Sequence, residues 1–222
     1  MKKLLRSLSS AQTATLVEIP FDRSAGSGLY RSVFKRLLDV IFVLFTAPIV
    51  LTFVFFVACI IAMDGKNPFY SQTRVGLGGR PFRIWKLRSM VVNADALLEA
   101  HLAANPLAAQ EWAKSQKLCN DPRITPIGRL IRMTSIDELP QLWNVLNGSM
   151  SLVGPRPMME QQEKLYTGQS YYALRPGITG PWQVSDRHTS HFIDRVRFDN
   201  QYNRELSFAG DIKLIMRTFS VV

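Results

Sequence analysis

A long uncharged run near the N-terminus is the feature that most constrains how this chain can fold. Between Asp39 and Asp64 lie 24 residues, Val40 to Met63, and none of them is charged. At about 1.5 Å per residue, a helix of this length could cross a bilayer core of about 30 Å. The run starts too far from Met1, and is too long, for a cleaved signal peptide. Because a core helix of a soluble domain is rarely apolar all round, the run predicts a helix in a membrane.

The manner of insertion depends on Pro48 and on the flanking charges. Pro48 removes a backbone donor and predicts a kink, where Thr46 could bond a carbonyl left free. Lys and Arg precede the run and also follow it, and positive flanks stay on the cytoplasmic side. A bent helix that enters and leaves the same leaflet satisfies both flanks. On the residues alone, an ordinary single pass with a tolerated proline remains an alternative.

Charge and composition exclude several classes of protein. Residues 1–88 carry 13 Lys and Arg against 4 Asp and Glu, whereas residues 89–222 carry 14 against 13. Such an excess fits an anionic membrane surface or nucleic acid, and the apolar run favours the membrane. A hydrophobic content of 47% excludes a disordered chain. Two cysteines and three histidines make a disulfide scaffold or a structural zinc site improbable.

The chain divides into three predicted parts, and the fold class is α+β. Residues 1–28 are polar and read as a mobile extension, residues 29–66 as the membrane helix, and residues 67–222 as a small, mostly helical catalytic domain. Weak alternation around glycines in 68–90 predicts a short β-hairpin; without a GxGxxG or GK[ST] pattern, these glycines favour a turn over a phosphate loop.

Further helices are expected along the rest of the chain. They span 92–118 with an interruption at Pro106, then 126–133, then a stretch after Ser135 that ends at Asn147-Gly148, and 158–166. Residues 175–184 read as a loop rich in glycine and proline. The stretches 191–206 and 212–219 are amphipathic and suit helices on a membrane surface, although core packing is equally compatible with each.

Asp137 and Glu138 are the main candidates for chemistry. They are expected at the start of a helix, where the backbone favours negative charge, and they point about 100° apart. One carboxylate can then face a phosphorus atom while the other faces a metal or a proton, although an Asp-Glu pair also caps helices. Mg²⁺ suits one or two carboxylates plus phosphate oxygens, and an aspartate can itself act as a nucleophile.

Arginines near this pair favour phosphate chemistry, because a guanidinium binds phosphate through two parallel hydrogen bonds. The candidates are Arg123, Arg129, Arg132 and Arg156. Arg175 and Arg187 flank the Gly/Pro loop and are candidates for holding a nucleotide. Taken singly, each arginine is equally compatible with binding phosphate and with being a solvated or salt-bridged side chain.

Several motifs together resemble the bacterial sugar transferases, the monotopic polyprenyl-phosphate phosphoglycosyl transferases. The resemblance extends from about residue 31 to the end of the chain. It is carried by TSIDELPQLWNVLNGSMSLVGPRP (134–157), KRLLDV (35–40), NPFYSQTRVGLGGRPFRIWKLRSM (67–90), DPRITPIGRLIR (121–132) and RPGITGPWQV (175–184). Among the members, it is similar to those that start exopolysaccharide repeat units with galactose 1-phosphate or glucose 1-phosphate.

This resemblance implies a specific reaction. The enzyme would transfer a sugar 1-phosphate from a UDP-sugar to undecaprenyl phosphate and release UMP. Asp137 would be the nucleophile that forms a covalent phosphosugar intermediate, Glu138 would assist with metal or proton transfer, and Mg²⁺ would neutralise the diphosphate. Arg132 and Arg156 match basic positions placed to hold phosphate.

The resemblance also implies a place in the cell and a shape for the helix. The helix would be re-entrant and broken at Ala47-Pro48, with the catalytic domain on the cytoplasmic face of the bacterial inner membrane. Membrane lipids are expected partners and nucleic acid is not, while two apolar faces are compatible with a homo-oligomer.

One residue departs from the family pattern, and one alternative function remains open. Where the pattern leads us to expect glycine at position 186 the chain has Asp186, which makes the role of Arg187 in holding UDP less certain. The alternative function is a catalytically silent, membrane-anchored interaction protein on the same scaffold. Retention of the acidic and basic positions favours the enzyme.

Overall fold

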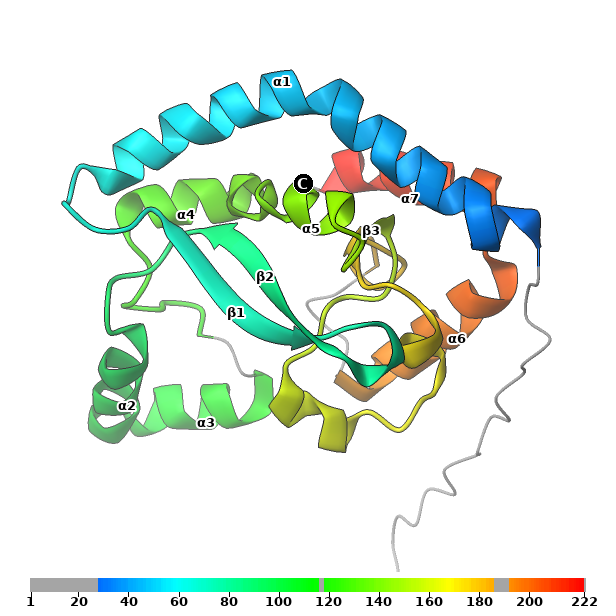
Figure 1. The fold of residues 1–222 in the computed structure, drawn as a ribbon. Helices are drawn as coiled ribbons and strands as arrows, with labels where there is room; N and C mark the ends of the chain where they lie inside the picture. The colour runs from blue at the N-terminus through cyan, green and yellow to red at the C-terminus, as the bar shows by residue number, and fades with distance from the viewer. Residues whose placement is uncertain (1–27, 116–117, 186–191, 222) are drawn as a thin grey trace, which may run out of the picture.

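The computed structural model describes residues 28–115, 118–185 and 192–221, which form a mixture of helices and two small sheets (Figure 1). The helices are α1 (Lys35–Ala62), α2 (Ala94–Ala104), α3 (Pro106–Ser115), α4 (Pro126–Met133), α5 (Gln141–Leu146), α6 (Arg195–Glu205) and α7 (Phe208–Val221). The strands are β1 (Phe69–Val75), β2 (Pro81–Leu87), β3 (Ser151–Val153) and β4 (Gly177–Thr179). Short 3-10 turns at Ile136–Glu138, Glu160–Leu165, Ser170–Ala173 and Phe192–Asp194 connect them.

The apolar run forms the long helix α1, which follows a π-helical turn at Tyr30–Phe34, so the expected start near Leu29 is confirmed. No interruption separates two helices at Ala47-Pro48, because a single α-helix includes Pro48. The helix continues through Pro48 and arches over the rest of the molecule (Figure 1). Proline removes a single ladder bond, and neighbouring hydroxyls bond other backbone carbonyls. Thr46 donates to Phe42 and Thr52 donates to Pro48, each at 2.8 Å.

The N-terminal end of α1 is attached to the body of the molecule. Arg36 donates to the backbone carbonyls of Val145 and Leu146 at the end of α5. The buried carboxylate of Asp39 accepts from the backbone N–H of Leu152 at 3.0 Å.

The C-terminal end of α1 is attached to the same body. Arg88, which follows β2, donates to both oxygens of Asp64 at 2.7 and 2.8 Å and to the Ile61 carbonyl at 3.1 Å. Both ends of the apolar helix therefore lie against one globular unit.

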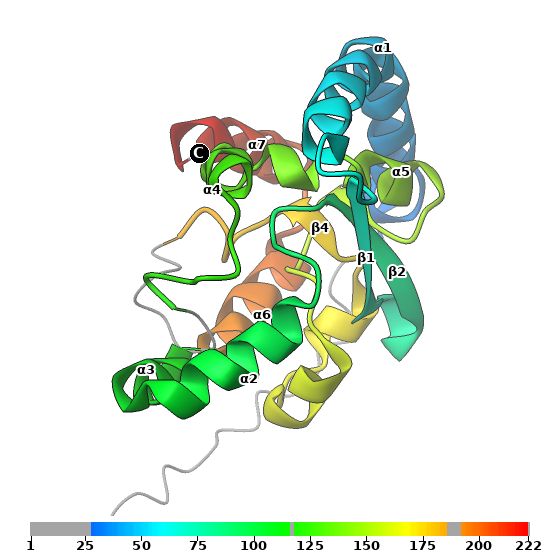
Figure 2. The same cartoon turned by 90° about the vertical axis from the view of Figure 1, so that its left-hand side faces the viewer.

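The core joins α1 to the globular part. One buried cluster combines Val54, Ala58 and Ile61 of α1 with Leu87 and Ile131. A second combines Val43 with residues of β2, α5 and the segment before β3. Figure 2 shows α1 lying along the edge formed by the hairpin and α5. Buried apolar area of this kind is the main stabilising contribution to such packing.

The hairpin prediction is confirmed, and the loop prediction for 175–184 is partly wrong. Strands β1 and β2 pair antiparallel from Phe69↔Leu87 to Val75↔Pro81. Within 175–184, however, β4 pairs parallel with β3. A three-residue strand is too short to show a period in its sequence. Gly154, after β3, and Gly177, in β4, allow the two backbones to approach closely. A Cβ at Gly154 would lie 2.2 Å from the Arg175 carbonyl oxygen.

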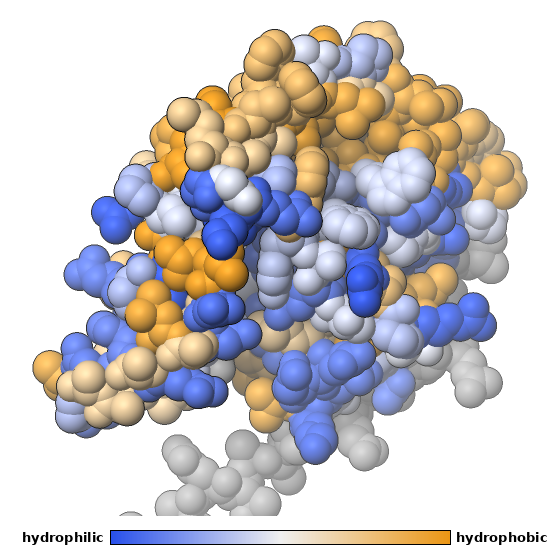
Figure 3. All heavy atoms as spheres, turned by 60° about the vertical axis from the view of Figure 1, so that its left-hand side comes forward, coloured by the Kyte–Doolittle hydropathy of each residue, from blue (hydrophilic) through white to orange (hydrophobic). Residues whose placement is uncertain are grey.

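The outer face of α1 is exposed and apolar. Phe45 is 83% exposed and Ile49 77%, and only 11% of the most apolar window of the helix is buried. This distinguishes α1 from the core helix of a soluble protein, which would be mostly buried. Figure 3 shows hydrophobic side chains gathered over this helix. By length and composition, α1 can anchor the chain in a membrane.

Other exposed apolar side chains lie on the short helices. They are Leu130 and Met133 on α4, Trp143 on α5, and Phe208, Ile212, Met216 and Phe219 on α7. In Figure 1, α4, α5 and α7 are drawn below α1, and Figure 2 shows that α5 lies beneath α1 while α4 and α7 lie to one side of it. On α7 the opposite face, with Leu214 and Ile215, packs on the core. Core packing is therefore confirmed for one side of α7, and its location on a membrane surface stays a prediction.

Candidate active site

Asp137 and Glu138 lie in the 3-10 turn Ile136–Glu138, between α4 and α5. The expected single helix after Ser135 is therefore not observed, since α5 begins only at Gln141. The reason is Pro140, which has no N–H to donate to the carbonyl four residues earlier, so the backbone closes 3-10 bonds such as Leu139 N–H to Ile136 at 3.2 Å. Asp137 is buried, with 7% of its surface exposed.

Lys86 on β2 is the cation closest to the two acids. Its Nζ lies 2.6 Å from Oε1 of Glu138 and 3.6 Å from Oδ2 of Asp137. Arg156, in the turn after β3, has Nη2 at 3.6 Å from the same Glu138 oxygen. We did not select Lys86 from the sequence as a site residue. The signal available was the alternation of β2, which turns Lys86 away from its neighbour Trp85.

Burial controls the ionisation of Asp137. Loss of solvent raises the pKa of this carboxyl, the charge of Lys86 opposes that rise, Glu138 adds to it, and Arg132 lowers it. Lys86 therefore favours the ionised and nucleophilic form of a buried acid that would otherwise hold its proton more tightly.

A small polar pocket lies beside this pair, between β1, β2, α5 and the turn that carries Arg156. Its lining includes Arg74, Lys86, Glu138, Gln141 and Arg156. Nε of Arg74 and Nε2 of Gln141 are buried and have no hydrogen-bond partner. Burial, followed by the charge of Arg156, lowers the pKa of Arg74. Buried donors without acceptors are costly, so an oxygen-rich anion would satisfy them.

An aromatic layer with a further cation adjoins this pocket. The guanidinium of Arg195 on α6 lies 4.1 Å from the ring centre of Trp182 and 4.6 Å from that of Phe192, and Arg156 lies 5.9 Å from Trp182. Burial, followed by the charge of Arg156, lowers the pKa of Arg195 to about 10. Sequence reasoning missed Arg195, since α6 brings it in from far along the chain.

The other predicted arginines are scattered. Arg132 is exposed on α4 and acts on Asp137 through its charge, and Arg129 is exposed on the same helix. Arg123 is buried and its guanidinium is occupied, because it binds Asp121 at 2.7 and 2.8 Å. Arg175 donates to the Gly148 carbonyl at 3.0 Å. Arg187 and Asp186 lie outside the described residues.

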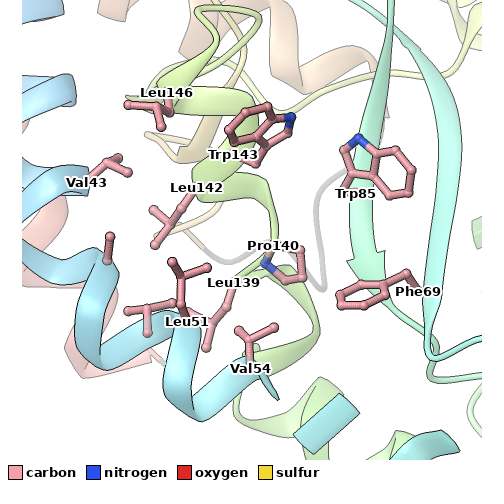
Figure 4. A pocket seen from close by; sticks show the side chains of 12 residues that line it. Val43, Leu51, Val54, Phe69, Trp85, Leu139, Pro140, Leu142, Trp143 and Leu146 are labelled. Carbon is pink, nitrogen blue, oxygen red and sulfur yellow. The ribbon is translucent and has the colours of Figure 1, made fainter. Parts of the chain in front are cut away.

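An apolar cavity of about 480 Å³ lies on the opposite side of residues 138–142 from the polar pocket. Figure 4 shows it between α1, α5 and the hairpin, and its lining is almost wholly apolar. Its walls are Val43, Ala47, Val50, Leu51 and Val54 of α1, Phe69 and Trp85 of the hairpin, and Leu139, Pro140, Leu142, Trp143 and Leu146.

The donor set for a divalent cation is limited to the acidic pair. Within the described residues there is no group of three or more His, Cys, Asp or Glu side chains that could hold a metal. Mg²⁺ commonly takes one or two carboxylates together with phosphate oxygens of the substrate. Asp137 and Glu138 fit that smaller role, provided that a diphosphate supplies the remaining oxygens.

The site therefore combines the buried carboxylate of Asp137 with the cation of Lys86, next to a pocket with buried donors that have no acceptor. Comparison with known proteins shows the family of the chain. The family profile described as bacterial sugar transferase matches residues 30–222, and the chain belongs to that family.

Three relatives illustrate the family match. The chain is 45% identical over 190 residues to the UDP-galactose-lipid carrier transferase of Erwinia amylovora, covering 85% of this chain and 40% of the relative. It is 46% identical over 164 residues to the undecaprenyl-phosphate galactose phosphotransferase of Salmonella typhimurium, covering 73% and 34%. It is 40% identical over 172 residues to the exopolysaccharide production protein ExoY of Rhizobium meliloti, covering 77% and 76%. The chain thus spans well under half of the first two relatives.

Proposed function

We propose that this protein transfers a sugar 1-phosphate from a UDP-sugar, UDP-galactose or UDP-glucose being favoured, to undecaprenyl phosphate and releases UMP. This would be the first membrane step in assembling an exopolysaccharide repeat unit. The observation that carries the proposal is the buried Asp137 beside Lys86, next to a pocket in which Nε of Arg74 and Nε2 of Gln141 have no acceptor. The names of the relatives supply the substrate classes.

The reaction would proceed in two displacements. A carboxylate oxygen of Asp137 attacks the phosphorus nearest the sugar, the bond from that phosphorus to the bridging oxygen breaks, and UMP leaves with the electron pair. A phosphate oxygen of the lipid then attacks the same phosphorus, which frees Asp137 and yields the lipid diphosphate sugar. Each step leaves the other side chains unchanged, so their task is electrostatic.

The cations divide this electrostatic task. Lys86 favours the ionised form of Asp137 before attack, and Arg156 and Arg74 would bind the diphosphate oxygens on the polar side. Glu138, held by Lys86 at 2.6 Å, orients that lysine and would share in holding Mg²⁺ with Asp137. When bound, Mg²⁺ would neutralise charge on the diphosphate and on departing UMP.

The arrangement of α1 supports a re-entrant insertion, with the catalytic part on the cytoplasmic face of the inner membrane. Both ends of α1 bind one globular unit, through Arg36 and Asp39 at one end and Arg88 at the other. A straight span would place those ends on opposite sides of a bilayer and would break one set of contacts. The exposed apolar residues of α4, α5 and α7 would lie at the surface of the same leaflet.

Mass spectrometry after rapid quenching tests the nucleophile. Purified protein mixed with Mg²⁺ and a UDP-sugar, without lipid acceptor, should release UMP in a single turnover. The peptide containing Asp137 should then gain the mass of the phosphosugar. Absence of both signals with every UDP-sugar tried would contradict the proposal and favour the silent interaction protein.

A further inference from the structure

The geometry points to a second binding site: we propose that the apolar cavity between α1, the hairpin and α5 holds the isoprenoid chain of the lipid phosphate acceptor. The inference rests on the proposed function and extends it, because it assigns the approach path of the acceptor and the residues that select its chain. The diphosphate of the donor would approach the acidic pair from the side of the polar pocket, which Lys86 and Glu138 line.

Strand β2 supplies the first half of the argument. Successive side chains of a strand point to opposite faces. Trp85 lines the apolar cavity, whereas its neighbours Ile84 and Lys86 line the polar pocket. One strand therefore forms a wall with a lipid-like surface on one face and a phosphate-binding surface on the other.

The catalytic segment repeats this division. Glu138 and Gln141 line the polar pocket, while Leu139, Pro140 and Leu142 line the apolar cavity. Asp137 immediately precedes this wall. A lipid whose tail lies against Leu139 and Pro140 would therefore reach the acidic pair with its phosphate within a few bonds.

The cavity can take the first isoprene units of one flexible apolar chain. Its volume of about 480 Å³ is within the usual range for ligand sites, and it opens beside the exposed face of α1. Trp85 and Trp143 are 36% and 59% exposed at its wall, so large indole surfaces remain uncovered. An isoprenoid phosphate has a single tail and a free phosphate monoester that can act as a nucleophile. A phospholipid has two tails and an esterified phosphate, which suits this cavity and this chemistry less well.

Photo-crosslinking of the full chain in nanodiscs tests occupancy without any turnover. The probe is a polyprenyl phosphate with a diazirine in its first isoprene units. We expect crosslinks to peptides that contain 43–54 and 139–146, and competition by unlabelled undecaprenyl phosphate. Crosslinks elsewhere, or equal labelling by a diazirine phospholipid that undecaprenyl phosphate does not displace, would overturn the inference.

A matched pair of variants tests the consequence for catalysis. Leu51→Trp narrows the cavity, and Leu44→Trp makes the same change on an exposed, non-lining face of the same helix. Leu51→Trp should raise KM for undecaprenyl phosphate by about tenfold, or 1.4 kcal/mol, and should leave single-turnover UMP release with donor alone unchanged. Leu44→Trp should change neither quantity.

The two proposals fail in different ways. If the donor half-reaction is normal and Leu51→Trp transfers to lipid as efficiently as Leu44→Trp, the cavity is not the acceptor site, although the transferase stands. If no donor half-reaction occurs in the unmodified protein, the transferase fails, while displaceable crosslinks at 43–54 would still identify a polyprenyl phosphate site.

Discussion

The wall formed by β2 and the segment 138–142 has a polar side with unpaired hydrogen-bond donors and an apolar side with uncovered carbon surface. On the polar side, Nε of Arg74 and Nε2 of Gln141 are buried donor atoms that have no acceptor. On the apolar side, a cavity of about 480 Å³ exposes carbon surface without a covering side chain. An anion would satisfy the buried donors, and a hydrocarbon would cover the exposed carbon surface. A substrate pair that consists of a diphosphate and a lipid would meet both at once.

Removal of the Asp137 carboxylate should have the largest effect, because both sides of the wall depend on it. Asp137→Asn keeps the shape of the side chain but removes the nucleophile. We expect transfer to fall by about 10³-fold or more, with no covalent adduct. Sedimentation with membranes should be unchanged, since α1 is not altered. Full activity in this variant would exclude the two-displacement mechanism.

Loss of Lys86 tests how the charges on the polar side control the ionisation of Asp137. The charge of Lys86 opposes the rise in the pKa of Asp137 caused by burial, so Lys86→Met should raise that pKa further. The carboxylate is then protonated at higher pH, and the acidic limb of the rate of UMP release moves upward in pH. We also expect a fall of about 10²-fold in rate at neutral pH, as for loss of one preorganised charge.

Lys66→Met is the control for that experiment, since Lys66 is exposed in the turn after α1. It should leave the pH profile where it is. If the pH profile of Lys86→Met coincides with that of the unmodified protein, Lys86 does not control the ionisation of Asp137.

Truncation of Arg74 should affect binding on the polar side alone. Hydrogen bonds to charged groups contribute about 1.5–3 kcal/mol, so Arg74→Met should raise KM for the UDP-sugar by about tenfold or more. KM for undecaprenyl phosphate should not change. Arg80→Met, at an exposed position in the hairpin turn, serves as the control. An equal rise in both KM values would show that the two sides are not independent.

The attachment of α1 should give the smallest effects, seen in thermal unfolding. Arg36→Gln loses hydrogen bonds to two carbonyls at the end of α5 and should lower Tm by about 2–4 °C per kcal/mol lost. Asp64→Asn removes one partner of Arg88, but Asp64 has half of its side chain exposed and the pair contributes little. Its Tm should therefore fall less than that of Arg36→Gln. The reverse order would mean that the C-terminal attachment of α1 is the stronger one.

Several elements could be predicted because their signal is local. The 24 uncharged residues before Asp64 required an apolar helix, the alternation in 68–90 required a hairpin, and Pro106 and Pro126 marked the starts of α3 and α4. The Asp137-Glu138 pair was identifiable as a candidate because it occurs within a motif that carries the resemblance.

Other features could not be read from local patterns. The parallel pairing of β3 with β4 depends on backbones that approach where glycine has no Cβ, and three-residue strands carry no period. The continuity of α1 through Pro48 is likewise visible only in the structure. Lys86 and Arg195 join the site from β2 and α6, so their roles exist only once those elements have packed.

The amino-acid sequence by itself therefore determined that this chain has an apolar helix, a hairpin and an acidic pair within a family motif, because periodicity, turn chemistry and residue type act over a few neighbouring residues. The tertiary structure decided which cations stand beside Asp137 and that one wall separates a polar pocket from an apolar cavity. Those facts depend on contacts between residues far apart in the chain, such as Lys86 with Glu138 and Arg195 with Trp182, which no local pattern encodes.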